Sequence, residues 1–302
     1  SSDSSMLTEQ NVFYNIAASE NDIRQPMFGV FAAPFALAAS LVSKAIMQPG
    51  AYPAMVQIVQ SVFLALGLVL IVRMTGASGE VKALALVCGT LLYPTLLFLL
   101  NVEQYVFPVF WLILLVWMIV QGEERGRSTA WVAASGSMLT SGILLLILPG
   151  KGTFKEKVRQ GALAVLLFAV VMILLGRVAM VLSSSETIRF LVQFAGEKLP
   201  FLARAKQYSV FLASCFVAPA AEITLFPNGG AVFQQAEVTG WSIAGFVAFA
   251  AAIAGFVVNR KRVFAQICAG WAAFSLLLLC VVGWGTSENG LVLYTLYFGW
   301  AF

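Results

Sequence analysis

Hydrophobic residues follow one another along most of this chain in long, nearly uncharged runs separated by short polar segments. A helix needs about 20 apolar residues to cross the hydrocarbon core of a bilayer, and most of these runs approach that length. The runs cover 27–47, 54–73, 83–100, 105–120, 129–149, 161–183, 208–226, 240–258, 263–284 and 291–302. They predict an all-α polytopic transmembrane helix bundle, because a membrane β-barrel would show short alternating segments instead.

Three of these runs differ from a plain spanning helix. Run 27–47 carries a proline and a lysine, and run 208–226 carries a proline and Glu222. Run 129–149 has a serine- and glycine-rich middle over 135–142. Irregular backbone at membrane depth is tolerated only where protein or water satisfies it. We therefore expect 129–149 to form a broken helical hairpin that turns back at this polar middle.

Composition supports a membrane protein and excludes several kinds of site. The 302 residues are 60% hydrophobic and 11% charged, whereas soluble domains average about 25% charged. Histidine is absent from the sequence, which argues against a zinc or iron site. The four cysteines lie in or beside apolar runs without metal-ligand spacing, which predicts buried small side chains. The net charge of +4 is small and spread over loops, so it does not indicate nucleic-acid binding.

The distribution of charge predicts an orientation. The basic loops are 73–82, 125–127, 151–159 and 260–262. The positive-inside rule places all of them in the cytoplasm, provided that 27–47 lies along or dips into the outer face and 208–226 stays on or returns to that side. The outer face then receives the polar segments 1–26 and 184–239 of a single transmembrane domain over 1–302.

The longest polar segment is the opening one, residues 1–26, in which four acids stand against Arg24. Its apolar positions recur at helical spacing, which predicts a short amphipathic helix on the membrane surface. A second such juxtamembrane helix is predicted over 184–207. Asp22 is suited to cap the helix of the first apolar run, whereas Asp3 lies in a serine-rich loop. Asp3 is therefore either a functional carboxylate or a solvated loop residue.

Several short motifs occur in a characteristic order. They are Ser2-Asp3-Ser4, Val12-Phe13-Tyr14, Arg24-Gln25-Pro26-Met27-Phe28, Asn101-Val102-Glu103-Gln104 before Tyr105, and Glu288-Asn289-Gly290 before Leu293-Tyr294-Thr295-Leu296-Tyr297. Together with the broken hairpin at 129–149, this order resembles the GT-C superfamily of polytopic membrane glycosyltransferases, which use polyprenyl-phosphate-linked sugars. The resemblance spans most of the chain, and Gln25 stands where that superfamily usually has histidine.

The resemblance implies an inverting glycosyltransferase that moves a sugar from a polyprenyl-phosphate donor to an acceptor at the outer face. It implies that Asp3 is the general base that removes a proton from the acceptor hydroxyl. Cationic side chains would stabilise the departing lipid phosphate, and polar side chains of outer turns would bind the substrates. The implied substrate-binding residues are Arg24, Glu103, Gln104, Arg189, Arg204, Glu288 and Asn289. The lipid-linked sugar is a substrate, no resident cofactor is implied, and a divalent metal is left open.

Two other classes of function fit the same sequence. In a transporter or channel, Glu222 and Arg177 would be intramembrane charges along a permeation path, although the sequence shows no internal repeat of the kind common in transporters. In a non-catalytic membrane assembly subunit, the acidic residues of the opening segment would be scattered in solvent and would form no common site. The enzyme hypothesis predicts an integral protein of a bacterial cytoplasmic membrane, with its active site outside and membrane lipids around it.

The two ends of the sequence suggest a piece of a longer protein. The sequence has no initiator methionine, and it stops within the apolar run LVLYTLYFGWAF. We therefore expect at least one more helix before Ser1 and more chain after Phe302.

Overall fold

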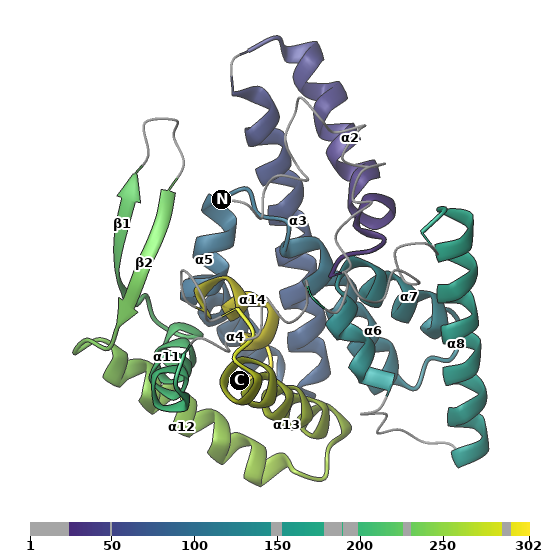
Figure 1. The fold of residues 1–302 in the computed structure, drawn as a ribbon. Coiled ribbons are helices and arrows are strands. Elements are labelled where there is room, and N and C mark those ends of the chain that lie inside the picture. The colour runs from purple at the N-terminus through teal and green to yellow at the C-terminus, as the bar shows by residue number, and fades with distance from the viewer. Residues whose placement is uncertain are drawn as a thin grey trace. The chain divides into compact units, whose positions relative to one another are not determined.

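The structure is a computed structural model that describes residues 24–48, 50–145, 153–177, 189, 199–225, 231–285 and 291–302. The described chain divides into two compact units, shown in Figure 1. The N-terminal unit contains 24–87 and 98–177, and the C-terminal unit contains 88–97 and 189–302. The sequence predicted one transmembrane domain; each of the two units contributes two helices of membrane-spanning length.

Helices make up most of the described chain, which confirms the predicted helical class. In the N-terminal unit they are α2 (Phe28–Ile46), α3 (Ala51–Met74), α6 (Val106–Gln121), α7 (Arg127–Ser137), the 3-10 helix η4 (Leu139–Leu145) and α8 (Phe154–Leu174). The boundary between the units falls within α4 (Gly79–Leu91) and α5 (Tyr93–Leu100). Among the described residues, α3, α8, α12 (Ser242–Asn259) and the continuous helix Val263–Val282 are long and apolar enough to cross a membrane.

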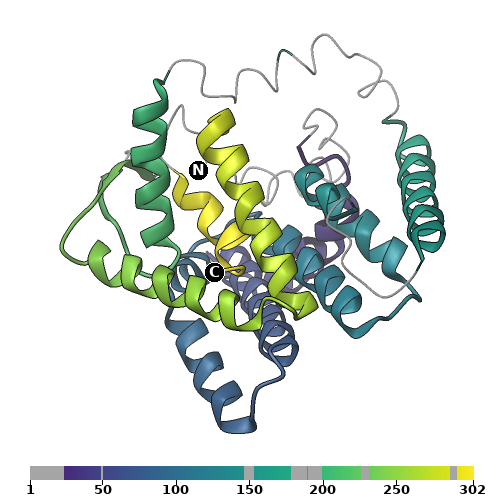
Figure 2. The same cartoon turned by 90° about the horizontal axis from the view of Figure 1, so that it is seen from below.

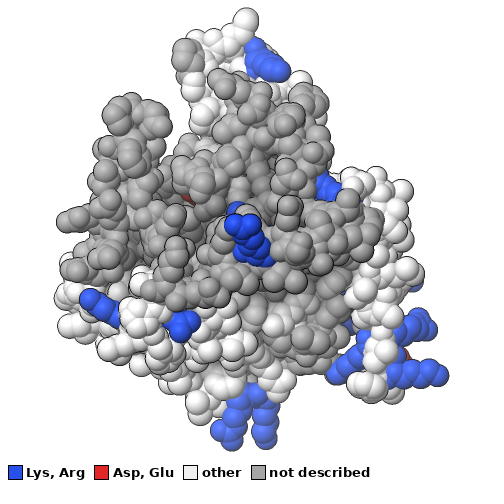
Figure 3. Space-filling model, viewed as in Figure 1, with Lys and Arg blue, Asp and Glu red and all other residues white. Residues whose placement is uncertain are grey.

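Two of these long helices leave most of their apolar surface outside the protein interior. In the 18-residue apolar windows of α8 and α12, only 11% of the residues are buried. Leu166 and Ile173 on α8 and Val247 on α12 are more than half exposed. Figure 3 shows the charged side chains of the described residues in small groups, one of them at the lower end of α8. Apolar faces of this extent require lipid around them, so the protein is an integral membrane protein.

Aromatic side chains from three helices form the centre of the N-terminal unit. Phe35 of α2 and Phe63 of α3 lie 4.7 Å apart between ring centroids, and Phe63 lies 5.1 Å from Phe107 of α6. Phe28, at the start of α2, contacts Phe107 at 6.1 Å. These four residues, called the aromatic cluster below, fix α2 and α3 against α6, because edge-to-face ring contacts add to the burial of large apolar surfaces.

The run 83–100 is a helix broken near Leu92, where α4 and α5 meet at a bend of 57°. Pro94 explains the break, because its ring clashes with the preceding turn and it has no N–H to donate. In a straight helix the Tyr93 N–H would donate to the Gly89 carbonyl. At the bend this hydrogen bond is lost, and each of the two groups has another partner. The Thr95 hydroxyl donates to the Gly89 carbonyl at 2.8 Å, and the Tyr93 N–H donates to the Phe216 carbonyl at 3.3 Å.

The C-terminal unit gathers its helices around Trp271. They are α11 (Phe201–Ser214), α12, α13 (Val263–Ser275) with its π-helical continuation η5 (Leu276–Val282), the short η6 (Leu291–Leu293) and α14 (Tyr294–Gly299) (Figures 1 and 2). Trp271 is fully buried, donates to the Tyr297 carbonyl at 3.0 Å, and packs against Phe298. This contact joins α13 to α14 inside the unit.

The second half of run 208–226 differs from its predicted character as an apolar helical run. It forms strand β1 (Ala220–Leu225), which pairs antiparallel with β2 (Ala231–Glu237) and carries a bulge between Ala220 and Glu222. Glu222 therefore lies in an extended ribbon and not on a helix. The Asn228-Gly229 pair in the connecting sequence is a strong hairpin signal that could have predicted this ribbon.

Prediction for the packing of α12. A Cβ atom added at Gly245 would lie 2.6 Å from the backbone oxygen of Ala213 in α11, whereas one at Gly255 on the same helix would meet nothing within 4 Å. We expect Gly245→Ala to lower the free energy of unfolding in detergent by about 1–3 kcal/mol. The added methyl group would clash with the Ala213 backbone, which can shift only if α11 moves with it. The matched control Gly255→Ala should leave the free energy of unfolding unchanged or raise it by up to about 1 kcal/mol. Equal effects would contradict the close approach of α11 and α12.

Candidate functional site

The residues that the sequence predicted for the site fall into three groups. Asp3, Glu288 and Asn289 lie outside the described residues, so their roles stay predictions. Arg189 and Arg204 belong to the C-terminal unit. The remaining three, Arg24, Glu103 and Gln104, belong to the N-terminal unit, where they lie at the starts of α2 and α6.

The motif Arg24-Gln25-Pro26-Met27-Phe28 is joined to the middle of the broken hairpin. α7 ends at Ser137, and Met138 is extended before η4 begins. The Leu139 N–H and the Gly136 carbonyl thereby lose their partners within the helix. Leu139 donates to the Arg24 carbonyl, and Gly136 accepts from the Met27 N–H, both at 2.7 Å. The chain folds back as predicted, since the indole of Trp131 in α7 donates to the Gly142 carbonyl in η4.

Glycine is required at position 136 by this close approach. A Cβ atom there would lie 2.6 Å from the sulfur of Met27 and 2.7 Å from its Cβ atom. The neighbouring Ser135 and Ser137 are buried, and their hydroxyls make no hydrogen bond with any described residue. The segment that the sequence marked as polar therefore contains buried hydroxyls on either side of the glycine that contacts Met27.

A layer of four buried polar residues borders the aromatic cluster. It consists of Gln25 before α2, Gln60 on α3, and Glu103 and Gln104 before α6, with exposed fractions of 2%, 0%, 7% and 3%. Each glutamine lies three positions before a member of the cluster: Gln25 before Phe28, Gln60 before Phe63, and Gln104 before Phe107. Gln60 and Phe63 share one face of α3, since residues three apart in a helix lie on the same side. The Gln25 carbonyl accepts from the Phe28 N–H, and the Gln60 amide contacts the Glu103 backbone. These four residues are called the polar layer below.

The polar layer presents hydrogen-bond acceptors that the described protein does not use. The Gln60 amide donates to the Glu103 carbonyl at 2.7 Å. The side-chain oxygens of Gln25, Gln60 and Gln104 accept no hydrogen bond from the described residues. A buried, unsatisfied polar atom costs about 1–3 kcal/mol and calls for an explanation such as a ligand or water. Acceptors of this kind suit a ligand rich in hydroxyl groups.

The two predicted arginines of the C-terminal unit occupy different settings. Arg189 is exposed and helical. Arg204 on α11 donates to the Val281 carbonyl in η5, and its guanidinium lies 5.9 Å above the ring of Phe201. This contact satisfies a carbonyl of the π-helical turn and so gives Arg204 a structural role; phosphate binding by Arg204 stays a prediction.

Tyr208 lies one helical turn after Arg204 and is buried. Its hydroxyl lies 2.9 Å from the Ser275 hydroxyl of α13. Burial raises the pKa of Tyr208 to about 12, so the phenol stays protonated at neutral pH. The pair stabilises the packing of α11 against α13.

The sequence analysis missed the contribution of α3 to the candidate site. Gln60 is the fully buried polar residue of a helix that otherwise buries mainly apolar side chains such as Val56 and Phe63. A glutamine within an apolar span is costly to bury in lipid and usually faces the protein interior. That rule, applied to the run 54–73, could have identified it.

Prediction for the polar layer. Gln104→Leu replaces an amide whose oxygen is unsatisfied among the described residues by an apolar side chain of similar size. We expect the free energy of unfolding in detergent to stay unchanged or to rise by about 1 kcal/mol. The comparison variant Gln60→Leu removes the donor to the Glu103 carbonyl and should lower it by about 1–3 kcal/mol. Equal destabilisation by both variants would show that the Gln104 amide is satisfied in the folded protein.

Comparisons of this chain with models of protein families, with curated proteins and with solved structures gave no match. Its functional assignment therefore depends on the residues and the geometry described above.

Proposed function

We propose that this integral membrane protein is a glycosyltransferase of the GT-C type, which transfers a sugar from a polyprenyl-phosphate donor to an acceptor at the outer face. The observation that carries the proposal is the polar layer, in which three buried glutamine oxygens lack donors among the described residues and the buried Glu103 directly precedes Gln104. Such groups are costly in a membrane protein and are typical of functional sites.

A sugar suits the chemistry of this layer. Each sugar hydroxyl is a donor, and the unsatisfied groups are acceptors, so binding would supply what the folded protein lacks. The carboxylate of Glu103 would make the strongest of these bonds, because a charged acceptor roughly doubles the strength of a hydrogen bond. An analogue without the hydroxyl would leave a buried acceptor unpaired, which would make the site selective.

The motif that the resemblance singles out includes one residue of this layer. Gln25 is a member of the layer, and Arg24 is held by its carbonyl to the Leu139 N–H. In the proposed reaction Asp3 takes the proton from the acceptor hydroxyl, and the acceptor oxygen attacks the anomeric carbon. The bond from that carbon to the phosphate oxygen breaks, and its electron pair leaves with the lipid phosphate. The role of Arg24 would be to stabilise that developing negative charge.

Prediction for the general base. Asp3→Asn should lower the rate of sugar transfer about 100-fold or more, because it removes the proton acceptor without changing the size of the side chain. The measurement is release of polyprenyl phosphate from radiolabelled polyprenyl-phosphate glucose and mannose in membranes that contain the protein. Glu80→Gln is the control, since Glu80 lies exposed in the first turn of α4. Unchanged turnover in folded Asp3→Asn protein would remove Asp3 from this role.

Prediction for the sugar-binding acceptor. Glu103→Gln keeps the shape of the side chain and removes its charge, so kcat/KM for the same donors should fall roughly 10- to 100-fold. The protein should stay folded in gel filtration in detergent. An inactive Asp3→Asn variant together with a fully active Glu103→Gln variant would show that the sugar binds away from the polar layer.

A further inference from the structure

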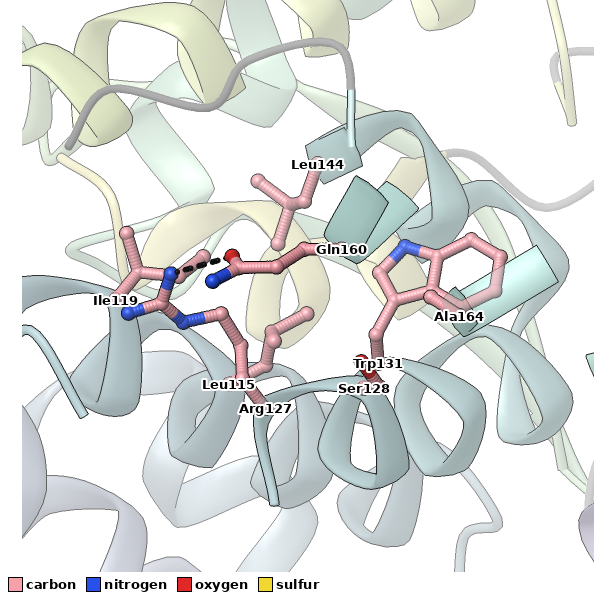
Figure 4. A pocket seen from close by; sticks show the side chains of 8 residues that line it. All are labelled: Leu115, Ile119, Arg127, Ser128, Trp131, Leu144, Gln160 and Ala164. Atoms are coloured by element: carbon pink, nitrogen blue, oxygen red, sulfur yellow. Dashed lines mark hydrogen bonds between the residues drawn. The ribbon is translucent and has the colours of Figure 1, made fainter. Parts of the chain in front are cut away.

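A second site lies at the other end of α6, where it meets α7 and α8. Figure 4 shows a pocket there that is partly open to solvent and is lined by residues of α6, α7, η4 and α8. Leu115, Ile119 and Trp131 form apolar walls, and Arg127, Ser128 and Gln160 supply polar groups. None of these residues belongs to the polar layer, so the pocket requires a separate explanation.

Arg127 is held in one orientation at this pocket. Its Nε donates to the Glu123 carbonyl and its Nη1 donates to the side-chain oxygen of Gln160, both at 3.0 Å (Figure 4). A guanidinium carries five N–H donors in a rigid plane, and these two bonds use two of them. An arginine fixed in this way loses little conformational entropy when it binds an anion with its other donors.

The surroundings of Arg127 favour an anion. Among the described residues of 122–160, the five basic residues outnumber the three acidic ones. The cations are Arg125, Arg127, Lys155, Lys157 and Arg159, and the acids are Glu123, Glu124 and Glu156. Glu123 accepts from the Arg125 N–H, and Glu156 caps α8 by accepting from the Thr153 N–H, so two of the acids are bound to backbone.

Lys157 is a further cation on α8, one helical turn before the pocket residue Gln160. It lies three positions before Gln160 and seven before Ala164, the two residues by which α8 lines the pocket. Residues at this spacing share one face of a helix. Lys157 is also less exposed than Lys155 and Arg159, as expected for a side chain on the face that packs toward α7.

The apolar walls indicate which anion binds. A free phosphate ion has no apolar surface that could pack against leucine, isoleucine and tryptophan side chains. The glycerol and upper acyl chains of a phospholipid have such a surface. The flank of α8 beyond the pocket is apolar and exposed, as a lipid-facing helix should be. Basic residues at the end of such a helix lie at the headgroup level. We propose that the Arg127 pocket binds the phosphate of an anionic phospholipid.

The test compares two arginines in the same loop. The thermal unfolding midpoint of purified protein in neutral detergent is measured with added phosphatidylglycerol, phosphatidylcholine or inorganic phosphate. We expect phosphatidylglycerol alone to raise the midpoint of the unmodified protein and of Arg125→Gln, whose exposed side chain does not line the pocket. Arg127→Gln should weaken the apparent affinity for phosphatidylglycerol about tenfold or more.

Arg127→Gln also removes hydrogen bonds to the Glu123 carbonyl and to Gln160. A third variant therefore separates loss of lipid binding from loss of folding. Ser128→Leu places an apolar side chain in the pocket and leaves the guanidinium intact, so it should weaken phosphatidylglycerol binding without lowering the lipid-free midpoint. Equal weakening by Arg125→Gln and Arg127→Gln would mean a diffuse basic surface and overturn the proposal. The same conclusion would follow from unchanged binding in Ser128→Leu, or from equal effects of inorganic phosphate and phosphatidylglycerol.

Discussion

Backbone groups inside a bilayer have no water to bond, so every break in a helix must be satisfied by another part of the protein. This structure meets that constraint at three breaks. The bend before Pro94 is closed by the Thr95 hydroxyl and by the Phe216 carbonyl. Arg204 donates to a carbonyl of the π-helical turn η5. The end of α7 is joined to Arg24 and Met27 before α2. The helix breaks therefore determine which segments of each unit must lie together.

The polar layer contains buried polar groups that lack such partners among the described residues. For this reason the proposed substrate site is located there. At the helix breaks, each lost bond is replaced, whereas the oxygens of Gln25, Gln60 and Gln104 have no donor among the described residues. Packing alone would favour apolar side chains at such positions, since they would fill the same space without the cost of desolvation. This cost is the reason for proposing a binding site at the polar layer.

The two proposed sites lie at opposite ends of α6. Glu103 and Gln104 precede its first residue, and the Arg127 pocket takes Leu115 and Ile119 from its last turns. The 16 residues of α6 span about 24 Å, which is shorter than a hydrocarbon core of about 30 Å but separates the two proposed sites by most of that depth. A substrate site at one end and a phospholipid headgroup at the other would place them near opposite surfaces of the membrane. The rigid helix between them is anchored by the aromatic cluster.

The sequence by itself determined the membrane class, most of the helices and the break in the run 129–149, because hydrophobic length and local breakers act over neighbouring residues. It also singled out Glu103 and Gln104, whereas their burial beside Gln60 depended on the packing of α3 against α6. The ribbon of β1 and β2 and the bond from Arg127 to Gln160, 33 residues away, were likewise decided by the tertiary structure. Local periodicity carries no information about which distant segment supplies the partner of a buried polar group.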